Sequence, residues 1–179
     1  CRTLGLQSDV LIQNSDGSYT LNCNNDKKYA FDSNGQLTNI QNRMGQNITI
    51  THLSNGNLII TEPISGKSLT VAYNSDGLVQ SVTDSSGKNV NFKDNEENCL
   101  MSTIDANGKT DSYTYDNWGR ILTGTDGDGV QYFTDTYDSN GRIYSQDDGV
   151  SGNKLTYFNY DTTSVSGQTT VTITDRNGN

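Results

Sequence analysis

The sequence predicts an all-β fold, an elongated and twisted antiparallel sheet of about seven or eight stacked β-hairpins. Two observations lead to this prediction. Glycine recurs in two interleaved series with a spacing of about 21 residues, and the segments between these glycines are rich in β-branched and aromatic residues. Such residues favour strands, while alanine, the best helix former, occurs only three times in 179 residues. Each 21-residue unit is therefore expected to hold two strands and two turns.

The glycines mark the expected structural turns. Glycine and asparagine accept positive φ more readily than other residues, and Ser-Asn-Gly or Ser-Asp-Gly precedes several of the turns, which is typical of hairpins. The first series is Gly35, Gly56, Gly77, Asn98, Gly119 and Gly141, where Asn98 stands in for a glycine. The second series is Gly45, Gly66, Gly87, Gly108 and Gly129.

The strands between the turns carry two columns of large side chains. Two residues after each first-series turn position is an aliphatic residue: Leu37, Leu58, Val79, Leu100, Ile121 and Ile143. Four residues before it are Phe31, His52, Tyr73, Asp94, Tyr115 and Tyr137. Side chains alternate between the faces of a strand, so positions four and six before the turn share one face. We expect the aliphatic column and the Phe31, Tyr73, Tyr115 and Tyr137 rings to form the repeat core.

The regular array is predicted to span residues 14–179, with residues 1–13 as an N-terminal flank. The Asn14–Gly17 turn starts a short first unit, and the spacing loosens after Gly141. The sequence stops at a second-series turn, Asp175 to Gly178, in the middle of a unit. We therefore expect a fragment of a longer protein.

Two of the turns resemble the signature of a known family. Tyr115-Asp116-Asn117-Trp118-Gly119-Arg120-Ile121 and Tyr137-Asp138-Ser139-Asn140-Gly141-Arg142-Ile143 resemble the Tyr-Asp (YD) repeat of rearrangement-hotspot (RHS) proteins, whose relatives include the teneurins. The segments around Gly35 and Gly77 are weaker copies. The resemblance covers about residues 14–179.

The resemblance implies a segment of a β-sheet that spirals into a hollow shell. In a large secreted or cell-surface bacterial protein, such a shell would enclose or present a toxin, effector or adhesive domain. The expected partner is then the remainder of a longer polypeptide, with further repeats and a C-terminal domain. No catalytic residue is implied, because the family's Asp-Pro self-cleavage motif is absent and Pro63 is the only proline.

Composition excludes several other classes. The net charge of −9 disfavours nucleic-acid binding, which needs a basic face, and no apolar run of 18 residues is long enough to span a membrane. No metal or cofactor is expected: one histidine and three scattered cysteines make no common zinc set, and Asp126-Gly127-Asp128-Gly129 lacks the other ligands of a calcium loop. His52 is expected to fill an aromatic slot. Cys1 is either a natural first residue that carries a lipid or an arbitrary boundary of the given sequence.

A binding module is the alternative function. Aromatic rings on a solvated sheet can stack on sugars, so carbohydrate or receptor binding would use Trp118, Tyr132, Tyr144 and Tyr157, which fall outside the main columns. Packing at loops and edges is the competing explanation for these four residues. The open edges of a sheet fragment also invite edge-to-edge self-association.

Overall fold

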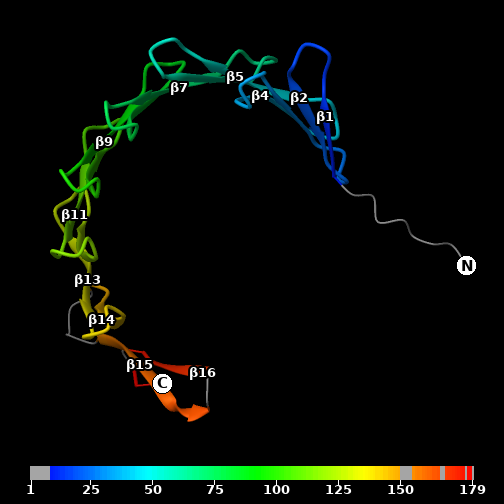
Figure 1. The fold of residues 1–179 in the computed structure, drawn as a ribbon. Helices are drawn as coiled ribbons and strands as arrows, with labels where there is room; N and C mark the ends of the chain where they lie inside the picture. Colours follow the sequence, from blue (N-terminus) through cyan, green and yellow to red (C-terminus); the bar gives the residue numbers. More distant parts are fainter. Residues whose placement is uncertain (1–8, 150–154, 166–167, 176, 179) are drawn as a thin grey trace, which may run out of the picture. The chain divides into compact units, whose positions relative to one another are not determined.

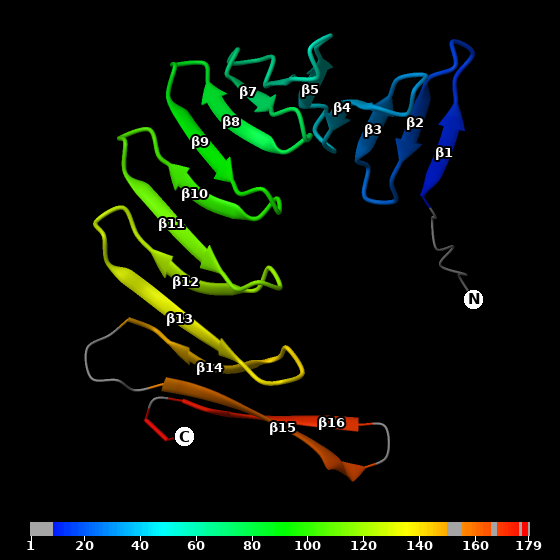
Figure 2. The ribbon, with the colours of Figure 1, turned by 60° about the vertical axis from the view of Figure 1, so that its left-hand side comes forward.

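A computed structural model describes residues 9–149, 155–165, 168–175 and 177–178, and it confirms the all-β prediction. The described residues form sixteen strands and no helix, and the strand order in the sheet follows the sequence from β1 to β16 (Figures 1 and 2). Residues 1–89 and 90–179 form two compact units. The strands are β1 (Val10–Gln13), β2 (Tyr19–Asn22), β3 (Lys28–Phe31), β4 (Leu37–Gln41), β5 (Asn47–His52), β6 (Leu58–Thr61), β7 (Ser68–Tyr73), β8 (Val79–Asp84), β9 (Asn89–Asp94), β10 (Leu100–Ile104), β11 (Thr110–Tyr115), β12 (Ile121–Thr125), β13 (Gln131–Tyr137), β14 (Ile143–Asp147), β15 (Leu155–Val165) and β16 (Gln168–Thr174).

Turns of both series share one hydrogen-bonding pattern, which the turn around Gly35 illustrates. The Asp32 N–H donates to the Gln36 carbonyl at 2.9 Å, and the Gly35 N–H donates to the Asp32 carbonyl at 3.1 Å. The Asp32 Oδ1 atom also accepts the N–H groups of Asn34 and Gln36. The same side-chain pattern, with Asp or Asn accepting from the residues two and four positions on, recurs at Asn42, Asn74, Asp84, Asn95, Asp105, Asp116, Asp126 and Asp138.

Positive φ occurs at the glycine positions of both series. These ten glycines have φ between 70° and 88°, and Asn98 has φ of 63°. Asp26, which belongs to neither series, also has a positive φ of 61°. It occupies the turn position of the short first unit, midway between Gly17 and Gly35, and the glycine spacing gave no sign of it.

Exchanging residues at two of these turns should change stability in opposite directions. A Cβ atom at Gly56 would meet nothing within 4 Å, so Gly56→Ala costs only backbone strain, about 1 kcal/mol. Asn98→Gly removes such strain and should stabilise the protein by a few tenths to 1 kcal/mol. Thermal unfolding followed by circular dichroism checks both. A lower melting temperature for Asn98→Gly would contradict the assignment of strain to this turn.

The two predicted columns lie opposite each other across each first-series hairpin. The register pairs Phe31 with Leu37, His52 with Leu58, Tyr73 with Val79, Asp94 with Leu100, Tyr115 with Ile121, and Tyr137 with Ile143. Directly opposed residues share a face. We call the face that carries these six pairs the aromatic face.

A β-bulge follows five of the six aliphatic residues. One extra residue is inserted at Thr38, Gln80, Met101, Leu122 and Tyr144, and there two residues oppose one on the partner strand. The β5–β6 hairpin has no bulge, since Ile59 pairs directly with Thr51. The missing residue reappears in the next turn, where Glu62 to Gly66 is one residue longer and the Glu62 carboxylate accepts the Ile64 and Ser65 N–H groups. The ten-residue glycine spacing is thereby preserved.

The column residues are half-buried. In a core between two layers, such residues would be fully buried. None of the described hydrophobic residues is fully buried. Leu37, Leu58, Val79, Leu100, Ile121, Ile143, Phe31, Tyr73, Tyr115 and Tyr137 are all of intermediate exposure. The reason is that within each unit the described strands lie side by side in a sheet, so neighbours on the same face supply the cover. Stability is then a sum of contacts between adjacent strands.

The aromatic face changes in character between the two units. In residues 1–89 a second row of pairs is apolar, as in Tyr29–Ile40, Ile50–Ile60 and Val71–Val82. In residues 90–179 the corresponding pairs are Phe92–Thr103, Tyr113–Gly124 and Asp135–Gln146. Charge follows the same division, since the first unit has six basic and seven acidic residues and the second has six and fourteen. The second unit therefore depends more on polar contacts.

Candidate functional site

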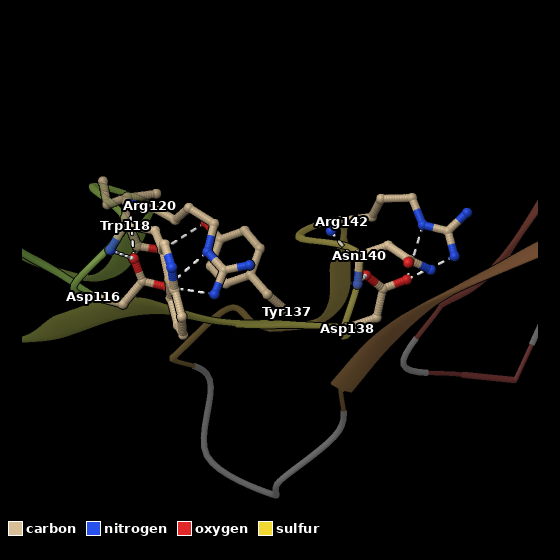
Figure 3. Close-up of polar contacts among 8 residues, drawn as sticks. Asp116, Trp118, Arg120, Tyr137, Asp138, Asn140 and Arg142 are labelled. Atoms are coloured by element: carbon tan, nitrogen blue, oxygen red, sulfur yellow. Dashed lines mark hydrogen bonds and ion pairs between the residues drawn. The ribbon is translucent and has the colours of Figure 1, made fainter.

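The two Tyr-Asp turns of the second unit each contain an arginine bound to the aspartate that closes the turn. The Asp116 Oδ1 atom accepts the N–H groups of Trp118 at 2.9 Å and Arg120 at 3.0 Å. Its Oδ2 atom accepts from Arg120 Nε at 2.7 Å and lies 2.6 Å from Nη2. Figure 3 shows this arrangement beside its equivalent in the next unit.

Asp138 and Arg142 repeat this geometry one unit later. The Asp138 Oδ1 atom accepts the N–H groups of Asn140 and Arg142 at 2.9 Å each, and Oδ2 binds the Arg142 Nε and Nη2 atoms at 2.8 and 2.7 Å. Each aspartate thus closes a turn with one oxygen and fixes a guanidinium with the other.

Each arginine also contacts the aromatic ring of the following unit. The Arg120 guanidinium carbon lies 4.4 Å from the centre of the Tyr137 ring and 4.9 Å from that of Trp118 (Figure 3). Arg142 lies 4.2 Å from the centre of the Tyr160 ring. Both distances to tyrosine are in the range of cation–π contacts. The arginine therefore links one unit to the next.

Tyr160 continues the aromatic column although the glycine spacing fails to place it. It comes 23 residues after Tyr137, because the connection between β14 and β15 departs from the regular unit length. In the sequence, only the Tyr160-Asp161 dipeptide indicated that Tyr160 continues the column. Contact with Arg142 identifies Tyr160 as the equivalent of Tyr137.

Ring atoms of the column make a second link between units. The Tyr137 hydroxyl donates to the Ile121 carbonyl at 2.7 Å, and the Tyr115 hydroxyl donates to the Leu100 carbonyl at 2.8 Å. His52 makes the same contact, with Nε2 2.9 Å from the Leu37 carbonyl oxygen. A carbonyl can only accept, so Nε2 carries the proton. His52 thus lies in an aromatic slot and replaces the tyrosine hydroxyl with a ring N–H.

The arginine contacts hold both aspartates in the charged form. Desolvation by itself raises the pKa of Asp116, but hydrogen bonds from the Arg120 side chain and backbone and from the Trp118 N–H outweigh it and leave the pKa below its usual value. For Asp138 the backbone hydrogen bond from Arg142 is the largest effect, and its pKa is also lowered. Partial burial raises the pKa of Tyr115 and Tyr137.

Acid should therefore destabilise the second unit through these aspartates. A carboxylate whose pKa is lowered by folding adds stability that is complete above its unfolded value, near 3.8, and is lost as the pH falls through the folded value. We expect the melting temperature to fall as the pH is lowered below about 4. An Asp116→Asn/Asp138→Asn variant keeps the turn acceptor, as Asn74 does naturally, and should show a smaller fall. An unchanged acid profile in this variant would contradict the assignment.

The four aromatic residues proposed as ligand contacts do not form one site. Trp118 is 80% exposed and lies beside Arg120, whereas Tyr144 and Tyr157 contact each other edge to face with ring centres 5.8 Å apart. Tyr132 packs edge to face on Phe133, and a hydrogen bond with Tyr113 raises its pKa to about 12. The depression next to Trp118 is lined by Trp118, Arg120, Tyr137, Asp138, Ser139 and Gly141.

The acidic residues and cysteines considered as metal ligands form no metal site among the described residues. The Asp126 Oδ1 atom accepts the N–H groups of Asp128 and Val130, and Asp128 forms an ion pair with Lys109. No cluster of His, Cys, Asp or Glu that could hold a metal occurs in the described part of the chain. Cys23 and Cys99 are free thiols in separate units. None of the described segments is a helix long and apolar enough to cross a bilayer.

The fold and these turns define a β-repeat scaffold in which two successive units of the second half are closed by Tyr-Asp turns, at Tyr115-Asp116 and Tyr137-Asp138. The sequence profile of the Teneurin YD-shell family matches residues 9–136, well over half of the chain. The chain therefore belongs to the teneurin YD-shell family, which confirms the resemblance to YD-repeat proteins. No curated protein sequence matches it.

Solved structures of the TcdB2-TccC3 proteins share this fold. TcdB2-TccC3-TEV is 13% identical with a TM-score of 0.60 over 88% of this chain and 9% of that one. TcdB2-TccC3-Cdc42 is 11% identical and TcdB2-TccC3 is 12% identical, each with a TM-score of 0.59 over 93% of this chain and 12% of the other. The chain thus spans about a tenth of the length of these structures. Identities this low show the fold alone.

Proposed function

We propose that this chain is a structural segment of a longer secreted or cell-surface protein, in which it forms part of a shell that encloses or presents a toxin, effector or adhesive domain. The observation that carries the proposal is the repetition of one turn along both ends of the strands, with the units linked by ring and guanidinium contacts. Such an array makes a wall of paired strands. The match to the YD-shell family supports this role.

Protease protection tests the proposal on the full-length gene product. The coding sequence on both sides of this segment should contain further 21-residue units followed by a different C-terminal domain. That domain should resist protease in the intact protein and become cleavable in a variant whose wall is loosened, such as Ile121→Asp. A coding sequence that stops near Asn179, or equal cleavage of the C-terminal domain in both proteins, would refute an enclosing shell.

A carbohydrate- or receptor-binding surface is the second candidate, and one observation favours it. Trp118 occupies the third position of its turn, where the equivalent residues of the other first-series turns are all polar: Asn34, Asn55, Asp76, Glu97 and Asn140. The turn does not need an indole there, yet the ring is 80% exposed and oriented by Arg120 beside a depression bordered by Asp138 and Ser139. A ring for stacking next to hydroxyl and carboxylate groups suits a pyranose.

A glycan array followed by calorimetry tests this second candidate. Trp118→Ala should weaken binding at least about fivefold, if a sugar stacked on the indole is worth about as much as a stacked nucleobase, roughly 1–3 kcal/mol. Tyr132→Ala, Tyr144→Ala and Tyr157→Ala each remove another of the exposed rings and show whether they contribute. Trp118→Asn is the matched control for the turn, because Asn140 holds the equivalent place. Absence of binding across a broad array would exclude the glycan function.

A further inference from the structure

Four Asn-Gly pairs lie in turns that the structure describes in full, and one of these turns is built differently from the others. An Asn-Gly pair is a reactive sequence, because the glycine nitrogen can attack the asparagine side chain and no Cβ atom on the glycine hinders the approach. All eight residues of these pairs are exposed, so water reaches each pair: Asn34-Gly35, Asn55-Gly56, Asn107-Gly108 and Asn140-Gly141.

In three of these turns an aspartate two residues before the asparagine holds the backbone N–H of the residue that follows the glycine. Asp32 Oδ1 accepts the Gln36 N–H at 2.8 Å, and Asp105 and Asp138 accept the equivalent N–H groups at 2.9 Å. We call these three aspartates the capping aspartates. In the fourth turn the same position is Leu53, whose side chain cannot accept a hydrogen bond. The N–H after the glycine of that turn is therefore available to another acceptor.

The side chain of Asn55 accepts this N–H. The Asn57 N–H donates to Asn55 Oδ1 at 3.1 Å, which folds the carboxamide back over the peptide bond to Gly56. The backbone of the turn is the same as elsewhere, since the Gly56 N–H donates to the Leu53 carbonyl at 2.9 Å and the other three glycines make this bond at 3.0–3.1 Å. The difference between the four turns thus lies in the side chains.

The reaction open to such a pair is deamidation. The Gly56 nitrogen loses its proton to the solvent and bonds to Asn55 Cγ, and the electron pair of the side-chain carbonyl moves onto Oδ1. This intermediate breaks its bond from Cγ to Nδ2, and the side-chain nitrogen takes up a proton from water and leaves as ammonia. Water then opens the resulting succinimide at either carbonyl, which yields an aspartyl or an isoaspartyl residue at position 55. One water is consumed and one ammonia is released, without any other reactant.

Two features of the Asn55 turn favour this reaction. Negative charge develops on Asn55 Oδ1, and the Asn57 N–H that already binds this oxygen is a donor of the kind that stabilises an oxyanion. Leu53 also brings no charge to the turn, whereas each capping aspartate places a carboxylate beside the reacting atoms, and like charges repel. In the capped turns the equivalent N–H is already bound to the aspartate, so both features are missing there.

We propose that Asn55 is a site of spontaneous deamidation in the folded protein, and that the capping aspartates protect Asn34, Asn107 and Asn140 from the same reaction. The product carries one more negative charge at the turn between β5 and β6. Its isoaspartyl form also adds one carbon atom to the backbone of that turn. This proposal is independent of the shell and glycan functions.

Peptide mapping by mass spectrometry tests the proposal on protein incubated at neutral and at mildly alkaline pH. In the folded protein Asn55 should deamidate at least about fivefold faster than each of the three capped asparagines, because it alone has the oxyanion donor. The rate should rise with pH, since the attacking nitrogen must lose its proton. In urea the four pairs should react at similar rates, because the difference depends on hydrogen bonds of the folded turn.

Exchanging the capping position between two turns tests the cause. Leu53→Asp supplies a capping aspartate and should slow deamidation of Asn55 at least about fivefold. Asp32→Leu removes one and should raise the rate at Asn34 to about that of Asn55. Leu53→Ala is the matched control, since it adds neither an acceptor nor a charge, and Asn55 should react in it as in the unmodified protein. Circular dichroism confirms that each variant retains its sheet.

Several outcomes would overturn the proposal. They are equal rates at the four pairs in the folded protein, the absence of any reaction included, a lead of Asn55 that persists in urea, or a rate at Asn55 that Leu53→Asp leaves unchanged. A rate at Asn34 that stays low without its aspartate would equally contradict the protective role of the cap. Should Asp32→Leu fail to fold, Asp32→Ala replaces it, because it removes the same acceptor and charge.

Discussion

Replacing Ile121 with aspartate is expected to destabilise the second unit by about 3 kcal/mol. The substitution removes a half-buried aliphatic side chain, worth about 1.5 kcal/mol, and places a carboxylate among apolar neighbours, at a similar cost. Ile121 lies opposite Tyr115, and its carbonyl accepts the Tyr137 hydroxyl, so disturbance at this position reaches three consecutive strands. Urea unfolding followed by tryptophan fluorescence measures the effect, because Trp118 lies in the adjoining turn.

Ile104→Asp is the matched control for this substitution. Ile104 is 37% exposed and pairs with Asn91 and Thr110 on the face opposite to the aromatic face. The same change of side chain and charge should therefore cost less than about 1 kcal/mol, as surface substitutions do. Equal losses of stability for Ile121→Asp and Ile104→Asp would mean that the aromatic face is not the face that holds the sheet together.

Gly124→Ala is expected to cost about 2 kcal/mol, in the range of overpacking substitutions. Gly124 lies in the middle of β12, where its φ is not positive, and it is buried between Tyr113 and Phe133 on the neighbouring strands. A Cβ atom there would lie 2.3 Å from Phe133 Cε1 and 2.9 Å from Tyr132 Cζ. The rings cover the glycine because the bulge brings both Tyr132 and Phe133 over one residue of β12.

A double-mutant cycle with Phe133→Ala isolates the cause. Removing the ring takes away the closest contact, so Gly124→Ala should cost less in the Phe133→Ala background, by at least about 0.5 kcal/mol. Melting temperatures and urea midpoints of the four proteins provide the coupling energy. If Gly124→Ala has the same effect with and without the Phe133 ring, the ring is not what requires glycine here.

The turn positions and the pairing of the columns could be predicted from the sequence because both depend on local chemistry. Positive φ restricts the residues at Gly35 and Asn98, and the alternation of side chains along a strand places Tyr113 and Tyr115 on one face. A fixed period then transfers each local inference to every unit. The His52 position followed in the same way, from its place in the column, and its contact with Leu37 matches that of the tyrosines.

Other features had no local signal. The bulges at Thr38 and Leu122 leave the period unchanged, and the Glu62 turn gains the residue that β6 lacks, so the spacing of Gly56 and Gly66 hides both changes. Tyr160 was missed because the unit before it is longer. The contact of Arg120 with Tyr137 joins residues 17 positions apart, on different strands, and no local pattern in the sequence indicates it.

The sequence by itself determined the class of fold, the turns and the two facing columns, since φ preference and side-chain alternation act within a few residues. Only the tertiary structure decided that the columns are half-buried in a single sheet, that Arg120 and Arg142 link successive units, and that rings cover Gly124. These features depend on which strands are neighbours and on how far each side chain reaches across them. A one-dimensional pattern does not contain that distance.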